Sequence, residues 1–164
     1  MQTIISKNIR NERTVETTAM LDKNLRLQLT LYTSKGSNGT VRSNASVDKL
    51  NEAGDCRTHL MFIDFNHTYL TEKSNRVTEK VLVTQHSKVD FTQVFLDARK
   101  FYKLPVWELR NISEVDGYLV GDIYGRDGFP AVQRVRTSPV VDTIGNLRIT
   151  ESGSVYKLVG ETDV

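Results

Sequence analysis

Cysteine, proline and long apolar runs are all scarce in this chain of 164 residues. The single cysteine, Cys56, cannot form an intramolecular disulfide, which is typical of a reducing compartment. The longest apolar runs, such as Met61–Ile63, fall far short of the ~18 residues that a membrane-spanning helix needs. The first residues lack a basic start followed by an apolar stretch, so we expect no secretory signal and a cytoplasmic location.

A strong excess of charge of either sign is also missing. The chain has 22 Lys and Arg residues against 20 Asp and Glu residues, which gives a net charge of +2. So weak a field makes non-specific binding of DNA or RNA unlikely. C-terminal to Pro105, however, the basic residues are nearly all arginine, which suits bidentate contacts with phosphate. An ordinary solvated strand face is the alternative explanation of these arginines.

The motifs of the common hydrolases, nucleotidases and zinc proteins are absent as well, so we expect no catalytic residues, no metal and no cofactor. His59 and His67 are on one predicted strand, but the nearby Asp64 points to the opposite strand face, which disfavours a metal site. Gly121–Gly128 has closely spaced glycines. A dinucleotide site needs a helix after them, whereas here Phe129-Pro130 and a strand follow, so turns and bulges explain these glycines better.

The first half of the chain predicts an antiparallel sheet. Leucines alternate with polar residues over Leu25–Tyr32, which predicts a half-buried strand with one apolar face. Alternation resumes over Thr40–Val47 after a turn, and Cys56–Tyr69 is apolar enough for a central strand. A three-stranded meander results. Residues 1 to about 20 lack sustained periodicity and predict a loose arm or an edge strand.

A helix is predicted after this sheet. No glycine or proline occurs between Val77 and Leu104, and apolar residues recur at helical spacing at Phe91, Val94, Phe95, Ala98, Phe101 and Tyr102. A capping box at Ser87–Asp90 would start the helix at Lys88. The absence of a breaker favours instead one long amphipathic helix from near Thr78. Pro105 ends the helix in either case.

A second module is predicted at 105–164, because all three prolines and seven of the ten glycines lie there. Short segments between turn residues predict four or five strands, at Val106–Leu109, Tyr118–Tyr124, Arg134–Ser138, Asn146–Thr150 and Ser154–Leu158. With the sheet and long helix of residues 1–104, this gives an α+β fold. The small module has little aliphatic bulk, so we expect it to pack on the helix or on another copy of the chain, as a homo-oligomer.

The most suggestive segment for function runs from Phe129 to Tyr156. Arg134 and Arg136 alternate on one strand and face the same way, so two guanidinium groups could meet one phosphate. Phe129 or Tyr156 could stack on a base. The same segment adds polar donors at Thr137, Ser138 and Arg148. The alternative is a polar strand face with a hairpin.

Between about Gly117 and Gly160 the chain resembles a segment common in small bacteriophage-encoded accessory proteins. The motifs that carry the resemblance are Ile123-Tyr124-Gly125, Gly128-Phe129-Pro130, Thr137–Val141 and Thr150–Leu158. With the sheet-then-helix half before them, they are similar in layout to the first type of phage anti-Thoeris proteins. The chain departs from the family pattern in two respects: Ala131-Val132 stands where many relatives have Asp-Gly, and Val155 stands where the residue before the last tyrosine is basic.

This resemblance implies an oligomeric sponge that sequesters cyclic nucleotide signals, made by bacterial TIR and related immune enzymes, without catalysis. It implies that an aromatic residue of the turn stacks on a base and that arginines of the sheet and the C-terminal hairpin hold phosphates. The candidate ligand-binding residues are Arg42, Phe129, Arg134, Arg136, Thr137, Ser138, Arg148 and Tyr156. The alternatives are a module that inhibits a host enzyme, a weak binder of single-stranded nucleic acid, and an enzyme with dispersed catalytic residues.

Overall fold

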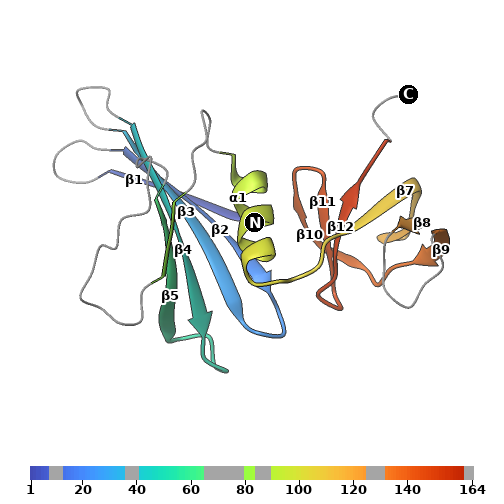
Figure 1. Ribbon diagram of the computed structural model, residues 1–164, viewed down its shortest axis with the longest axis horizontal. Coiled ribbons are helices and arrows are strands. Elements are labelled where there is room, and N and C mark those ends of the chain that lie inside the picture. Colours follow the sequence, from blue (N-terminus) through green and yellow to red (C-terminus); the bar gives the residue numbers. More distant parts are fainter. Residues whose placement is uncertain (8–12, 36–40, 65–79, 84–89, 125–131, 161–164) are drawn as a thin grey trace. The chain divides into compact units, whose positions relative to one another are not determined.

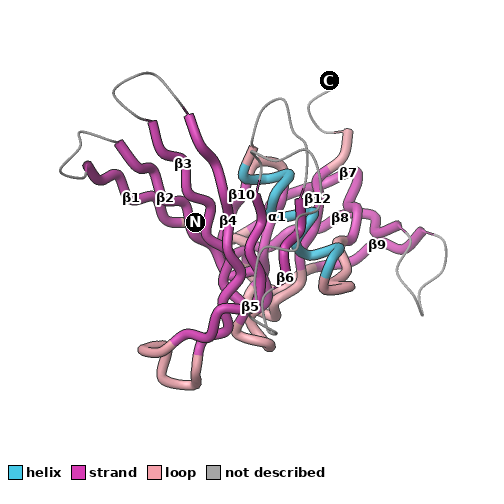
Figure 2. The backbone as a smooth tube through the Cα atoms, turned by 60° about the vertical axis from the view of Figure 1, so that its left-hand side comes forward, coloured by secondary structure: helices cyan, strands magenta, loops and turns pink. Residues whose placement is uncertain are grey.

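The computed structural model describes residues 1–7, 13–35, 41–64, 80–83, 90–124 and 132–160. Over these residues the chain forms twelve strands and one helix (Figures 1 and 2). It divides into two compact units, Met1–Ala98 and Arg99–Val164, which we call unit 1 and unit 2. The sequence predicted this division after Leu104. Each unit contains one six-stranded sheet.

The strands of unit 1 lie in the sheet in the order of the sequence. They are β1 (Gln2–Lys7), β2 (Arg13–Asp22), β3 (Leu27–Lys35), β4 (Val41–Leu50), β5 (Arg57–Asp64) and β6 (Lys80–Val83). Neighbouring strands pair antiparallel, except that β5 and β6 run parallel. The strand predicted from the alternating leucines is confirmed as β3, and the strand that follows it is β4.

One face of this sheet is apolar because β3 places a leucine at every second position. Leu27, Leu29 and Leu31 are all buried. The register sets Leu29 beside Val47 of β4, and Val47 lies in turn beside Met61 of β5. These cross-strand pairs form a continuous buried layer.

The opposite face of the same sheet carries small hydroxyl residues. Thr18 and Thr30 face each other across β2 and β3, with their hydroxyl oxygens 3.3 Å apart, and Ser46 is next in line on β4. Thr30 and Ser46 are buried, so their hydroxyl groups need partners within the protein. Hydrogen bonds between hydroxyl side chains, such as that of Thr18 with Thr30, therefore contribute to the stability of this side of the sheet.

Helix α1 (Phe91–Phe101) begins directly after a capping aspartate. The Oδ1 atom of Asp90 accepts a hydrogen bond of 3.3 Å from the amide of Thr92, which satisfies one of the unpaired amides of the first turn. One side of the helix is buried, at Val94, Phe95 and Ala98. These are the apolar positions whose helical spacing the sequence displays.

The helix ends in a left-handed residue. Lys103 has a φ of 56°, and its amide bonds the carbonyl of Lys100 while the amide of Leu104 bonds that of Arg99. This pattern is a Schellman ending, in which lysine takes the place usually held by glycine. The buried Arg99 also donates through Nη2 to the Pro105 carbonyl, at 2.9 Å. The helix is thus tied to the segment that leads into the sheet of unit 2.

The α+β class and the long helix predicted from the sequence are wrong. The protein is mostly β, and α1 is its only helix within the described ranges. Lys80–Val83 is strand β6 rather than helix, because it pairs in parallel with Met61–Asp64. That partner lies far away in the sequence, so a local pattern cannot reveal it. Of the two alternatives for residues 1 to about 20, a loose arm or an edge strand, the edge strand is confirmed, since they form the edge strand β1 and its neighbour β2.

Unit 2 contains the remaining strands, in the order β10-β11-β12-β7-β8-β9. They are β7 (Trp107–Val115), β8 (Tyr118–Tyr124), β9 (Val132–Arg136), β10 (Val140–Ile144), β11 (Leu147–Thr150) and β12 (Val155–Leu158). All five predicted segments are strands, and β10 is an additional one. Strands β12 and β7 pair in parallel, and the other neighbours pair antiparallel.

This second sheet curls on itself. Its two edge strands, β9 and β10, are joined by only three residues, which reach roughly 14 Å. In a flat sheet the edges of six strands would lie about 24 Å apart. Backbone hydrogen bonds secure the junction, from Thr137 to Leu119 at 2.8 Å and from Val140 to Gly117 at 2.9 Å. Strands β9 and β10 therefore act as one bent strand that closes a barrel.

The parallel pair follows from this closure. Counting β9–β10 as one, the chain runs through five strands that alternate in direction, so the first and the fifth point the same way. The interior of the barrel is filled by Leu109, Leu119, Ile123 and Tyr156. Because the interior is occupied by side chains, functional groups of unit 2 have to be sought on its outer surface.

Candidate functional site

Three arginines and two tyrosines gather on the outer surface of β7, β8 and β9. Strand β8 alternates buried and half-buried residues along its whole length, so one set faces the core and the other faces outward. The register places Arg110 opposite Asp122, and Asp122 opposite Arg134. We call this surface the arginine–tyrosine face, and its members are Arg110, Tyr118, Tyr124, Arg134 and Arg136.

Two of the arginines lie over the two tyrosine rings. The Cζ atom of Arg136 is 4.3 Å from the centroid of the Tyr118 ring, and that of Arg110 is 4.8 Å from the Tyr124 centroid. Each contact contributes about 0.5–1 kcal/mol at an exposed position. Each contact also holds its guanidinium group in place and leaves the N–H donors in the plane of the group. Nη2 of Arg110 donates to Oε2 of Glu108, at 3.4 Å.

A bulge in β7 shapes the centre of the face. The register between β7 and β8 shifts after Arg110, so that Asn111 and Ile112 together oppose Gly121. Asn111 has a φ of 52°, a conformation that asparagine adopts more readily than most residues. A Cβ atom on Gly121 would lie 2.8 Å from Leu109 Cγ and 3.0 Å from the Arg110 carbonyl. The bulge therefore requires glycine on the neighbouring strand.

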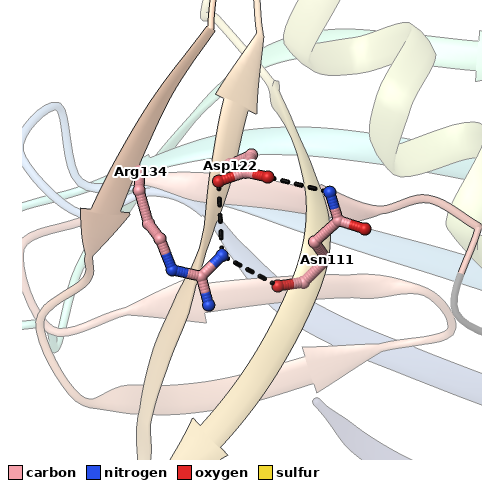
Figure 3. A network of polar contacts seen from close by, with 3 residues as sticks. All are labelled: Asn111, Asp122 and Arg134. Carbon is pink, nitrogen blue, oxygen red and sulfur yellow. Dashed lines mark hydrogen bonds and ion pairs between the residues drawn. The ribbon is translucent and has the colours of Figure 1, made fainter.

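Asn111, Asp122 and Arg134 form a polar network from three strands (Figure 3). The Asn111 amide donates through Nδ2 to Asp122 Oδ2, at 2.8 Å. Nη1 of Arg134 donates to Asp122 Oδ1 at 3.2 Å and to the Asn111 carbonyl at 3.3 Å. Within the described part of the chain both Arg134 bonds use Nη1, so Nη2 and Nε keep donors for a ligand.

The network keeps Asp122 ionised. The hydrogen bond from Asn111 lowers the pKa of Asp122 most, partial desolvation opposes this, and the hydrogen bond and charge of Arg134 lower the pKa further. An ionised carboxylate in turn holds the Arg134 side chain against the sheet. Asp122 is therefore a positioning group, and it limits the net positive charge of the face.

Thr137 and Ser138, both predicted to bind a ligand, lie at the junction that closes the barrel. The buried Thr137 accepts the Leu119 amide at 3.1 Å through Oγ1 and donates to the Ser138 carbonyl at 2.8 Å. Ser138 Oγ lies 3.0 Å from Ser152 Oγ and accepts the Ser152 amide at 3.1 Å. Both hydroxyl groups thus hold strand connections together.

Arg148 and Tyr156 lie away from the arginine–tyrosine face. Nη1 of Arg148 donates to the carbonyls of Gly145 and Leu147, at 2.8 and 3.0 Å, and so stabilises the turn between β10 and β11. Tyr156 belongs to the core of the barrel. Of the predicted residues whose side chains the structure describes, Arg134 and Arg136 are the two that it brings onto the arginine–tyrosine face.

The two remaining predicted residues cannot be assigned to this face. Arg42 is on β4 in unit 1, opposite Ser34, but its side chain is outside the described residues. Phe129 falls in the range 125–131, which is also outside them. Their roles in ligand binding stay predictions.

Histidine and cysteine give no second centre in the described parts of the chain. His59 Nδ1 lies 3.0 Å from Oδ1 of the buried Asp48, while Cys56 is exposed just before β5. His67 is outside the described residues. The described residues contain no group of three or more His, Cys, Asp or Glu side chains that could hold a metal ion.

Comparisons with known proteins add no relative. No protein-family model, no curated protein and no solved structure matches the chain. Among the described residues, no helix has the length and apolarity needed to cross a membrane.

Arg110, Tyr118 and Tyr124 were not predicted to be ligand-binding residues of this face. A signal was present, because Tyr118–Tyr124 alternates in a predicted strand and places both tyrosines on the same side. The position of Arg110 could not be predicted from alternation within one strand. It depends on the pairing of β7 with β8 and on the bulge that follows.

Proposed function

We propose that the protein is a non-catalytic binder of a small anionic nucleotide, held on the arginine–tyrosine face. The observation that carries this proposal is the stacking of Arg136 on Tyr118 and of Arg110 on Tyr124. A guanidinium group fixed on a ring can donate in its plane to a phosphate. Its outer side can stack on a base, as arginine does in RNA recognition.

Arg134 supports the same proposal by a different route. Its Nη1 atom is held by Asp122 and by the Asn111 carbonyl, so its remaining donors are presented at a fixed place. Preorganised donors lose less conformational entropy when a ligand binds. The face thus combines ordered donors with flat surfaces, and both parts of a nucleotide find suitable partners.

The absence of catalysis is part of the proposal. The described residues of the face supply donors and rings, and the carboxylate at its centre, Asp122, is held ionised by Asn111 and Arg134. A general base has to be able to accept a proton near neutral pH, and these contacts oppose that. The biological role that we propose is sequestration of a cyclic nucleotide immune signal by a phage-encoded protein, which rests on the family resemblance of the C-terminal half.

Calorimetry provides the test. The wild-type protein at tens of micromolar is titrated with cyclic dinucleotides, cyclic trinucleotides and cyclic ADP-ribose isomers, and we expect at least one to bind. Arg136→Ala and Tyr118→Ala should each weaken that binding about ten- to a hundredfold. Arg57→Ala, which removes an exposed arginine of unit 1, should leave it unchanged and controls for net charge.

Two outcomes would contradict this proposal. If no member of the panel binds, or if Arg57→Ala weakens binding as much as Arg136→Ala, the face is not a nucleotide site. Binding only to single-stranded oligonucleotides, with a steep dependence on salt, would identify a nucleic-acid binder instead.

A protein partner is the second candidate for the same face. Val115 lies opposite Tyr118 in the register and is largely exposed, so an apolar side chain borders the arginines and tyrosines. Arginine and tyrosine are enriched at the centres of protein interfaces. Val115→Ala, which removes the apolar side chain without adding charge, should weaken binding to a host enzyme while leaving the nucleotide titration unchanged.

A further inference from the structure

The edge strands of the two sheets differ in how well they are protected against pairing with a strand of another chain. In unit 2, β9 carries Arg134 and Arg136, and the register of β10 shifts between Val140 and Asp142. Charges and bulges are common devices that keep an edge strand from pairing with another chain. β1 pairs regularly with β2, and from Gln2 to Ser6 it contains no charge, proline or register shift.

Two neighbouring isoleucines stand on this unprotected edge. Ile4 is 50% exposed and Ile5 is 57% exposed. Adjacent residues of a strand point to opposite faces of the sheet, so no single layer packed on one face can cover both. A strand added beside β1 places side chains next to each of them.

We propose that β1 pairs antiparallel with β1 of a second copy of this chain, which joins the two open sheets across a two-fold axis. In the described part of the chain β1 has a strand neighbour on one side only. An identical strand satisfies the outward amides and carbonyls of both copies at once, because a two-fold interface is self-complementary. The inference does not depend on the proposed nucleotide binding.

Strand geometry restricts the register of this pairing. In an antiparallel ladder, two opposite residues either exchange backbone hydrogen bonds or both direct their N–H and C=O groups away from each other. These two kinds of residue alternate along β1, so only residues an even number of positions apart can stand opposite each other. The two-fold axis therefore has to pass through a residue position. Ile4 is the middle of the uncharged stretch Gln2–Ser6, so an axis at Ile4 pairs this stretch with itself and leaves Lys7 outside. Ile4 then lies opposite Ile4, and Ile5 opposite Thr3.

Sedimentation velocity tests the dimer. At about 50 µM we expect the wild-type protein to have twice the monomer mass of 18.6 kDa. Ile4→Lys should reduce the mass to that of the monomer, because lysine blocks edge pairing. Val141→Lys is the matched control, since Val141 is 61% exposed on the edge strand β10, and it should remain dimeric. A monomeric wild type, or a dimeric Ile4→Lys variant, overturns the proposal.

Disulfide crosslinking tests the register. In a Cys56→Ser background, which removes the exposed native thiol, Ile4→Cys should form a covalent dimer readily. The Ile5→Cys control should not, because its two thiol-bearing residues would be offset along the strands, with Cα atoms about 8 Å apart. A dimer that crosslinks through Ile5, or through neither position, contradicts the axis at Ile4.

Discussion

The sheets of the two units hold the same number of strands, but only that of unit 2 closes on itself. Three residues join the edge strands of unit 2, whereas β1 and β6 are the two separate edges of the sheet in unit 1. A closed sheet uses its inner face for its own core and turns its outer face to solvent. An open sheet leaves unpaired ladder groups at its margin.

This difference separates the sites at which the two units can make contacts. Unit 2 offers a face, on which β7, β8 and β9 hold arginines and tyrosines in fixed positions. Unit 1 offers an edge, where β1 exposes its backbone and two isoleucines. Our two proposals therefore use different chemistry, namely charged and aromatic side chains in one case and main-chain pairing in the other.

The largest expected effect comes from a charge in the buried layer of unit 1. Leu29→Asp should destabilise the sheet by several kcal/mol, because Leu29 is completely buried and the carboxylate would have no partner. The single tryptophan, Trp107, lies in unit 2 and reports on that unit. We expect circular dichroism to show loss of strand signal while Trp107 fluorescence stays native. Emission typical of unfolded protein would mean that the barrel depends on unit 1.

A smaller effect is expected at the bulge of unit 2. Gly121→Ala introduces a Cβ atom that overlaps Leu109 Cγ and the Arg110 carbonyl, so β7 and β8 have to separate. We expect a loss of about 1–3 kcal/mol in thermal or urea unfolding followed by Trp107 fluorescence. Ser113→Ala, an exposed change on β7, is the control and should stay within about 0.5 kcal/mol. Equal stability of the two variants would contradict the close approach of the strands.

The smallest expected effect is on the free energy of unfolding at acid pH. Asn111→Gly preserves the left-handed backbone but removes the hydrogen bond to Asp122, so the pKa of Asp122 should rise toward its ordinary value. Since this pKa is lowered in the folded state, its stabilising contribution is present above about pH 4 and is lost as the pH falls through the folded value. The stability difference between wild type and variant should therefore narrow below about pH 4.

Nuclear magnetic resonance of the Asp122 carboxyl carbon measures this pKa directly. Asp142, which lies on β10 outside the network, serves as the reference residue in the same spectra. An unchanged Asp122 titration in Asn111→Gly would show that Arg134 alone maintains the low pKa.

The alternation of apolar and polar residues correctly predicted those strands in which buried and exposed side chains alternate. The leucines of β3 and the Tyr118–Tyr124 segment of β8 are examples, because each strand has one face in a core. Strand β6 was missed since Lys80–Val83 is short and pairs with β5, which lies many residues earlier. Its apolar residues also fit a helical reading, and no glycine or proline separates them from α1.

The site was predictable only to the extent that it lies on one strand. Arg134 and Arg136 were correctly expected to share a face, because they are two residues apart on β9. The register of β7, β8 and β9 places Arg110 and Asp122 beside them, and the bulge in β7 positions Asn111. Neither the register nor the bulge can be predicted from residue spacing within one segment. Tyr156 shows the reverse case, since its aromatic ring suggested stacking but fills the core.

The parallel pairing of β7 with β12 has a mechanical consequence. These strands are the first and the last of unit 2, and they run side by side in the same direction. A tether pulling at Leu104 and another pulling at Gly160 would therefore slide the two strands lengthwise past each other. The backbone bonds between Trp107–Leu109 and Tyr156–Leu158 would then bear the load together instead of opening one after another. We expect unit 2 to resist stretching between these two points more strongly than a hairpin such as β10–β11 pulled apart at its open end.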